Sequence, residues 1–139
     1  MAKWLLKTEP DDYSFDNLLR DGKTVWNGVN NNLALKYLRQ IKKGDALMIY
    51  HTGAEKAVVG LAVAVSDAYS DPKSGDAKQA VVDIKPGPTL RFAVTLAAVK
   101  ADPRLARWEL PRLGRLSVMP VSEEIWKIIL AMAEQPPTK

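Results

Sequence analysis

The nine residues 57–65 form an almost wholly apolar segment in which glycine and alanine stand between the valines. An apolar run of this length is typical of a strand that is buried on both faces. The small residues let neighbouring backbones approach closely and let the strand bend. The segment therefore predicts a central strand that curls within a barrel-like sheet, which the rest of the chain must complete.

Other short apolar segments predict the partner strands of this sheet. They cover residues 3–7, 46–50, 81–85, 90–94 and 116–119. Pro86-Gly87-Pro88 stands between the third and fourth of these segments and is expected to break the strand there. The exposed segment 70–76 has turn composition and is expected to be a mobile loop.

Helical spacing of apolar residues behind capping residues predicts several short helices. They run from Ser14 to residue 20, from one of the amides 30–32 to about residue 41, from Thr95 to residue 100, and from Ser122 to the prolines at 136 and 137. Many strands without a regular alternation with helices favour an α+β fold with a curled, mainly antiparallel sheet. We expect one domain over residues 1–135 and a short flexible tail over 136–139.

The absence of some residue types excludes several classes of site. The 139 residues contain no cysteine and one histidine, so disulfides, thiolate catalysis and multi-histidine or cysteine metal sites are excluded. No signal peptide or membrane-spanning run is recognisable, which predicts a cytoplasmic protein without membrane contact. The net charge of +4 favours an anionic partner without requiring one.

Trp26 stands directly before Asn27-Gly28 and the three amides 30–32. An aromatic ring beside amide donors and acceptors suits a pocket for a flat, polar ligand such as a nucleobase. Gly28 permits backbone angles that other residues resist. A core tryptophan followed by a turn and a helix cap explains the same residues, and the segment alone leaves both interpretations open.

The single histidine, His51, lies between Tyr50 and Thr52 at the end of a predicted strand. Strand ends often present groups that contact ligands, and a neutral imidazole can donate one hydrogen bond and accept another. A partly buried histidine bonded to the backbone is the alternative. A hydrolase built on His51 is disfavoured, because Ser117 lies between Leu116 and Val118 rather than in a nucleophile turn.

Three cations, Lys36, Arg39 and Lys43, fall at positions i, i+3 and i+7 of the second predicted helix. Because this helix follows the Trp26 segment directly, its basic face could contact the phosphates that flank a bound base. A solvated charged face is the alternative.

Five motifs in the same order and spacing make the chain resemble the EVE-domain family of the PUA-like superfamily. They are Trp4-Leu5-Leu6-Lys7-Thr8-Glu9-Pro10, Trp26-Asn27-Gly28-Val29-Asn30-Asn31, Gly44-Asp45 with Tyr50-His51-Thr52, Tyr69-Ser70-Asp71-Pro72, and Arg115-Leu116-Ser117-Val118-Met119-Pro120-Val121. The resemblance extends over nearly the whole chain. It implies a PUA-like α+β pseudobarrel with short flanking helices, and a non-catalytic reader of modified nucleobases, modified cytosine in DNA above all.

The resemblance also implies a set of base-pocket residues. These are Lys7, Thr8, Trp26, Gly28, Val29, Asn31, Tyr50, His51, Thr52, Arg115 and Ser117. The implied partner is DNA or RNA that carries modified bases, bound by a monomer without a cofactor or metal. A protein-interaction or small-metabolite module on the same fold is the alternative function.

The chain departs from the usual family pattern at two kinds of position. Thr8 and Thr52 stand where serine is usual, and both keep the hydroxyl group. At the start of the second helix, Asn30, Asn32 and Leu35 replace arginine, tyrosine and arginine.

Overall fold

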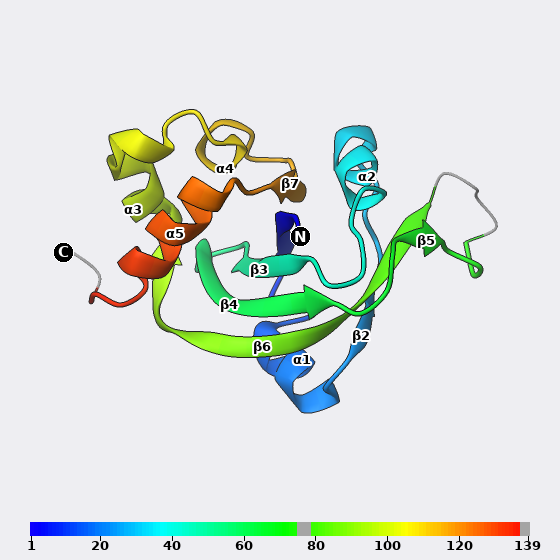
Figure 1. The fold of residues 1–139 in the computed structure, drawn as a ribbon. Helices are drawn as coiled ribbons and strands as arrows, with labels where there is room; N and C mark the ends of the chain where they lie inside the picture. The colour runs from blue at the N-terminus through cyan, green and yellow to red at the C-terminus, as the bar shows by residue number, and fades with distance from the viewer. Residues whose placement is uncertain (75–78, 137–139) are drawn as a thin grey trace.

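The computed structural model describes residues 1–74 and 79–136, which fold around one curled sheet (Figure 1). Its strands follow the order β2-β6-β4-β3-β1-β7, and β5 pairs with β6 outside this path. The strands are β1 (Lys3–Thr8), β2 (Thr24–Trp26), β3 (Ala46–His51), β4 (Ala57–Ala64), β5 (Tyr69–Ser70), β6 (Ala80–Thr95) and β7 (Val118–Pro120). β1 and β3 are parallel, whereas the other pairs are antiparallel. The predicted α+β class and the curled, mainly antiparallel sheet are confirmed, while β2 and β5 were not predicted.

Short helices flank the sheet, and most of them begin at a side-chain cap. They are α1 (Phe15–Asp21), α2 (Asn32–Leu38), α3 (Leu96–Ala101), the 3₁₀ turn η1 (Pro103–Leu105), α4 (Glu109–Arg112) and α5 (Glu123–Met132). The side chains of Ser14, Asn31, Thr95 and Ser122 each accept a hydrogen bond from the backbone N–H three residues later. These predicted helix starts are confirmed. In the described part of the chain, no helix is long and apolar enough to span a bilayer.

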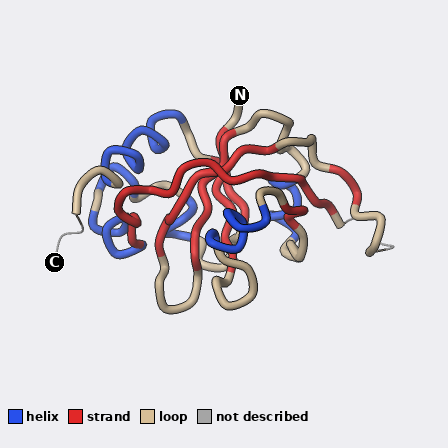
Figure 2. Tube along the Cα trace, turned by 90° about the horizontal axis from the view of Figure 1, so that it is seen from below, coloured by secondary structure: helices blue, strands red, loops and turns tan. Residues whose placement is uncertain are grey.

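β6 runs without interruption through Pro86-Gly87-Pro88, so the predicted strand break is wrong. From Pro86 to Thr89 this strand advances three residues while its partner β4 advances two, from Ala62 to Gly60. The extra residue makes a bulge, which bends a strand without ending it. Pro86, which would disrupt the hydrogen bonds of a flat sheet, therefore lies where the sheet curls. Figure 2 shows the curvature of the strands.

The core at the centre of the sheet fixes the position of α1. Leu5, Leu47 and Ile49 are fully buried. The ring of Phe15, at the start of α1, lies where a side chain at Gly60 would otherwise be. Because Gly60 has no side chain, α1 packs directly against the sheet.

Asp45 shows why the Gly44-Asp45 motif matters for the fold. Its buried carboxylate accepts hydrogen bonds from the backbone N–H groups of Ala2 and Lys42 and from the indole N–H of Trp4, at 2.9–3.0 Å. A buried carboxylate needs such donors to offset its loss of hydration. Asp45 thus joins β1 to the turn before β3.

Two predicted flexible segments lie partly outside the described residues. These are the loop 70–76, since residues 75–78 are not described, and the tail 136–139, since residues 137–139 are not described.

Candidate ligand-binding site

A cavity of about 480 Å³ opens where the end of β1 meets β2 and the segment that follows β2. Three parts of the chain form its walls: β1 with the turn before α1, residues 24–29, and Ser117 before β7. The lining residues are Lys7, Thr8, Asp12, Tyr13, Thr24, Val25, Trp26, Asn27, Gly28, Val29 and Ser117.

Two aromatic side chains, Trp26 and Tyr13, form one wall of the cavity. Their rings meet edge to face, with centroids 6.4 Å apart and an interplanar angle of 83°. Trp26 is only 7% exposed, so it belongs to the core and lines the cavity at the same time. The Tyr13 hydroxyl donates a hydrogen bond to the Asp21 carboxylate at 2.8 Å, and burial together with this carboxylate raises the pKa of Tyr13. The aromatic wall is therefore held in place before any ligand binds.

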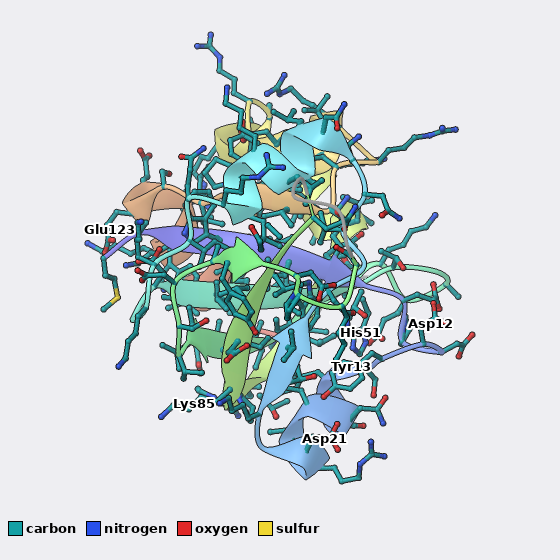
Figure 3. All side chains as sticks on the ribbon, turned by 90° about the vertical axis from the view of Figure 1, so that its right-hand side faces the viewer. Asp12, Tyr13, Asp21, His51, Lys85 and Glu123 are labelled. Atoms are coloured by element: carbon teal, nitrogen blue, oxygen red, sulfur yellow. The ribbon has the colours of Figure 1, made fainter. Side chains whose placement is uncertain are left out.

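The tight turn between β1 and α1 carries Asp12 and Tyr13 to the cavity. The carbonyl of Glu9 accepts hydrogen bonds from both backbone N–H groups, each at 2.9 Å. The Thr8 hydroxyl donates to the Tyr13 carbonyl at 2.6 Å. Figure 3 shows Asp12 and Tyr13 at the same end of the molecule as Asp21 of α1. The hydroxyl at position 8 thus shapes the turn, a role that serine and threonine share.

Lys7 is the cation in the cavity wall. Its Nζ donates to the carbonyl of Gly114 at 3.2 Å and lies 5.4 Å from the centre of the Tyr50 ring. Burial lowers the pKa of Lys7. The ammonium group is thus fixed at the edge of the cavity, partly removed from water.

Three other polar side chains in the wall are available to a ligand. Within the described residues, no hydrogen bond engages the side chains of Asp12, Asn27 or Ser117. The carboxylate can only accept hydrogen bonds, whereas the amide and the hydroxyl can donate or accept them.

Apolar groups and a glycine turn complete the wall. Val29 is buried, whereas Val25 is 45% exposed. Gly28 has a φ of 78°, in the left-handed region that favours glycine. This conformation turns the chain from β2 toward the start of α2.

The structure brings six of the eleven predicted pocket residues to this cavity: Lys7, Thr8, Trp26, Gly28, Val29 and Ser117. Asn31 caps α2 and lines a second cavity together with Arg115. Tyr50, His51 and Thr52 do not line the cavity, although β3 pairs with β1 in the register Lys7 to Tyr50 and Thr8 to His51. The register therefore brings the backbone of β3 beside the cavity wall, and contact of these three side chains with a ligand remains a prediction.

His51 has both ring nitrogens engaged within the chain. Its Nε2 accepts the backbone N–H of Phe15 at 3.0 Å, and its Nδ1–H is directed at the Glu55 carboxylate at 2.7 Å. Thr52 donates to the Glu9 carboxylate at 3.0 Å. Tyr50 is buried beneath Lys7, and burial raises its pKa. These contacts hold β3, the turn after β1 and the start of α1 together.

Sequence reasoning missed five lining residues: Asp12, Tyr13, Thr24, Val25 and Asn27. Asp12 had the pattern of a solvated turn residue, and β2 was not predicted at all. The one available signal was Tyr13 directly before the helix cap Ser14, where a large side chain is held close to the turn.

The three cations predicted to share one helical face do not do so, because α2 ends at Leu38 and Arg39 is its C-cap. Lys43 lies beyond the helix in the turn before β3, where its backbone N–H donates to Asp67. The prediction of a continuous basic helical face over Lys36, Arg39 and Lys43 is wrong. Their contact with phosphates remains a prediction.

Comparison with known proteins places this geometry among relatives. The model described as "EVE domain" matches residues 2–132. Human thymocyte nuclear protein 1 is 26% identical over an alignment that covers 99% of this chain and 76% of that protein. Its structure in complex with 5-methylcytosine-containing DNA superposes with a TM-score of 0.90 at 25% identity, covering 99% of this chain and 100% of that chain.

A bacterial relative is closer in sequence, and a more distant one shares the fold. The NMR structure of a Rhodopseudomonas palustris protein is 40% identical with a TM-score of 0.91, covering 96% of this chain and 94% of that one. An ASCH protein of Zymomonas mobilis, 13% identical, has a TM-score of 0.59 over 98% of this chain and 99% of that one, a likeness of fold alone. The expected PUA-like fold is confirmed.

Proposed function

This chain belongs to the EVE domain family, and from that membership we propose that it binds a modified cytosine in DNA through the cavity lined by Trp26 and Tyr13. The observation that carries the proposal is a cavity lined by two packed aromatic rings and by three polar side chains that form no hydrogen bond within the described residues. The structure of the human relative in complex with 5-methylcytosine-containing DNA supports the choice of ligand.

The chemistry of the cavity suits the hydrogen-bonding edge of cytosine. That edge presents an amino donor beside ring-nitrogen and carbonyl acceptors. We assign the amino group to the Asp12 carboxylate and the acceptors to Lys7, Asn27 or Ser117, which can all donate. A base must leave the helical stack to enter such a cavity, and an aromatic wall offsets part of the lost stacking.

The methyl group of a modified cytosine requires an apolar contact. Val25 and Val29 supply methyl groups in the same wall. Burying one methyl group in such a contact contributes on the order of 1 kcal/mol. We therefore expect 5-methylcytosine to bind moderately more tightly than cytosine, and we expect the loss of the whole base to weaken binding more than the loss of the methyl group.

We propose binding without turnover, by a single chain. A histidine acts as a general base through a free ring nitrogen, but the Nε2 of His51 already accepts the N–H of Phe15 and its Nδ1 faces Glu55. The cavity is formed by one chain, so a monomer is sufficient for the proposed site.

Fluorescence anisotropy with four DNA oligonucleotides that differ at one base tests the proposal. The variable position carries 5-methylcytosine, cytosine, thymine or an abasic site. We expect 5-methylcytosine to bind most tightly, cytosine about 5-fold more weakly, and thymine and the abasic site still more weakly. Equal affinity for all four would contradict base recognition, and binding of a peptide or metabolite instead would favour the alternative function.

A further inference from the structure

A second cavity, of about 350 Å³, adjoins the proposed base site. Its walls continue the segments that line the first cavity: Asn31 and Leu33 follow Val29, and residues 112–116 precede Ser117. Lys7 connects the two, because it lines the first cavity and its Nζ donates to Gly114, which lines the second. A ligand that extends out of the base site past Ser117 or Val29 therefore meets this second cavity.

The second cavity combines cations with exposed apolar side chains. Arg112 and Arg115 both line it, and within the described residues neither forms a salt bridge with a carboxylate. Arg112 Nε donates to the carbonyl of Arg107 at 3.0 Å, which fixes the side chain and leaves its terminal nitrogens available. A guanidinium group in this state is suited to a phosphate.

The apolar part consists of two leucines from different elements. Leu33 of α2 is 39% exposed, and Leu113, which follows α4, is 37% exposed. Because both leucines line one cavity, they give it an exposed apolar surface. Together with the arginines they present an apolar surface edged by positive charge, which complements a sugar or base edge joined to a phosphate.

We propose that this second cavity holds the nucleotide next to the modified base in the same DNA strand. Arg112 and Arg115 bind the phosphate that links the two nucleotides, while Leu33 and Leu113 contact the neighbouring sugar and base. This inference rests on the proposed function of the first cavity. It assigns the phosphate contact to the segment before β7 rather than to the cations 36, 39 and 43 that follow the base-site segment.

A double-mutant cycle between protein and DNA tests the assignment. The probes are single-stranded oligonucleotides with one central 5-methylcytosine, in which each flanking phosphate in turn is replaced by an uncharged methylphosphonate. The variants are Arg112→Gln and Arg115→Gln, with the exposed Arg91→Gln on β6 as the matched control and thermal melting as the check of folding. Arg91 lies outside both cavities.

We expect one neutralised linkage to weaken wild-type binding about 10-fold. Arg112→Gln or Arg115→Gln should cause a similar loss, lower the salt slope by about 0.7, and make binding insensitive to that linkage. Arg91→Gln should retain both the affinity and the sensitivity. If both arginine variants keep the full sensitivity to the linkage, or if wild type tolerates every neutralised linkage, the inference is wrong.

An abasic oligonucleotide separates this inference from the function of the base site. If wild type prefers the 5-methylcytosine strand over the abasic strand, the proposed base site is supported. If the arginine variants at the same time remain fully sensitive to the neutralised linkage, the proposed role of the second cavity is wrong. Wild type without that preference would reject the proposed function itself. Tighter binding of RNA with the same sequence would contradict the proposal that the ligand is DNA.

Discussion

Trp26 belongs to the core and to the cavity wall, so its substitution is a poor test of binding. The ring is 7% exposed and packs on Tyr13. Truncating a buried tryptophan to alanine costs roughly 3–5 kcal/mol of folding stability. Lost binding in Trp26→Ala would therefore combine two effects. The two interpretations of this residue, a core side chain and a pocket side chain, are both compatible with its position.

Asp12 offers a sharper test, because its neighbour Asp11 carries the same charge and does not line the cavity. We expect Asp12→Asn to reduce the preference for 5-methylcytosine over thymine by roughly 1–3 kcal/mol, since an amide can pair with either base. Asp11→Asn makes the same change of charge and should keep the preference. Anisotropy titrations with both bases measure the effect, and equal behaviour of the two variants would remove Asp12 from base recognition.

Lys7 should lower the folding stability of the protein near neutral pH while it contributes to DNA binding. Burial lowers its pKa from the ordinary value of 10.5, so between the lowered pKa and 10.5 the unfolded chain binds more protons at this site than the folded chain. The contribution of Lys7 to stability must then rise with pH. We expect the free energy of unfolding of wild type minus that of Lys7→Met, measured with urea, to increase as the pH approaches 10.5. A difference that falls with pH would contradict this account, as would unchanged DNA binding by Lys7→Met near neutral pH.

At the scale of elements, α1 controls the cavity through its first residue. Phe15 packs over Gly60 of β4, and its backbone N–H donates to His51 of β3. These contacts fix the preceding turn, which carries Asp12 and Tyr13. The geometry of the site thus depends on two residues outside it.

Gly60→Ala should destabilise the fold by about 1–3 kcal/mol, because the new methyl group would overlap the Phe15 ring. The double variant Gly60→Ala/Phe15→Leu should recover part of this loss, since the smaller side chain leaves room. Chemical denaturation of the single and double variants measures both effects. Additive losses in the double variant would show that the clash is not the cause.

His51→Ala should lower stability by about 1–3 kcal/mol, because the buried N–H of Phe15 loses its acceptor. The folded fraction of this variant should bind modified DNA almost normally. Thermal melting and a titration below the melting temperature distinguish the two properties. Unchanged stability with lost binding would instead support the sequence-based expectation that His51 contacts the ligand.

Sequence reasoning succeeded where the signal was local. Caps such as Ser14 and Ser122 require only a few neighbouring residues. The apolar segment 57–65 correctly predicted the strand β4, although one face of this strand, with Val59, Leu61 and Val63, is only partly buried. Sequence reasoning was wrong about a strand break at Pro86, because partners that are distant in the chain decide such features. The bulge at Pro86 depends on β4, and the direction of the His51 side chain depends on α1.

At the scale of the whole molecule, the curled sheet brings together residues that lie far apart in the chain. Lys7, Trp26 and Ser117 meet in one cavity, and the segments that follow Val29 or precede Ser117 form the second. The sequence did not reveal that there are two separate cavities. It therefore led to the assignment of Asn31 and Arg115 to the base site, whereas both line the second cavity. The fold therefore presents two adjoining cavities along the proposed path of a DNA strand.

NMR mapping of DNA binding tests the central claim most directly, and the chain of 15.4 kDa is well suited to it. The protein is titrated with an oligonucleotide that contains one 5-methylcytosine, and then with the same strand containing thymine. We predict saturable shifts for the 5-methylcytosine strand at the indole N–H of Trp26 and at the backbone N–H groups of Gly28, Val29 and Ser117, and weaker shifts for thymine. Shifts confined to residues outside this cavity, or identical titrations with both strands, would contradict the proposal that the cavity reads a modified base.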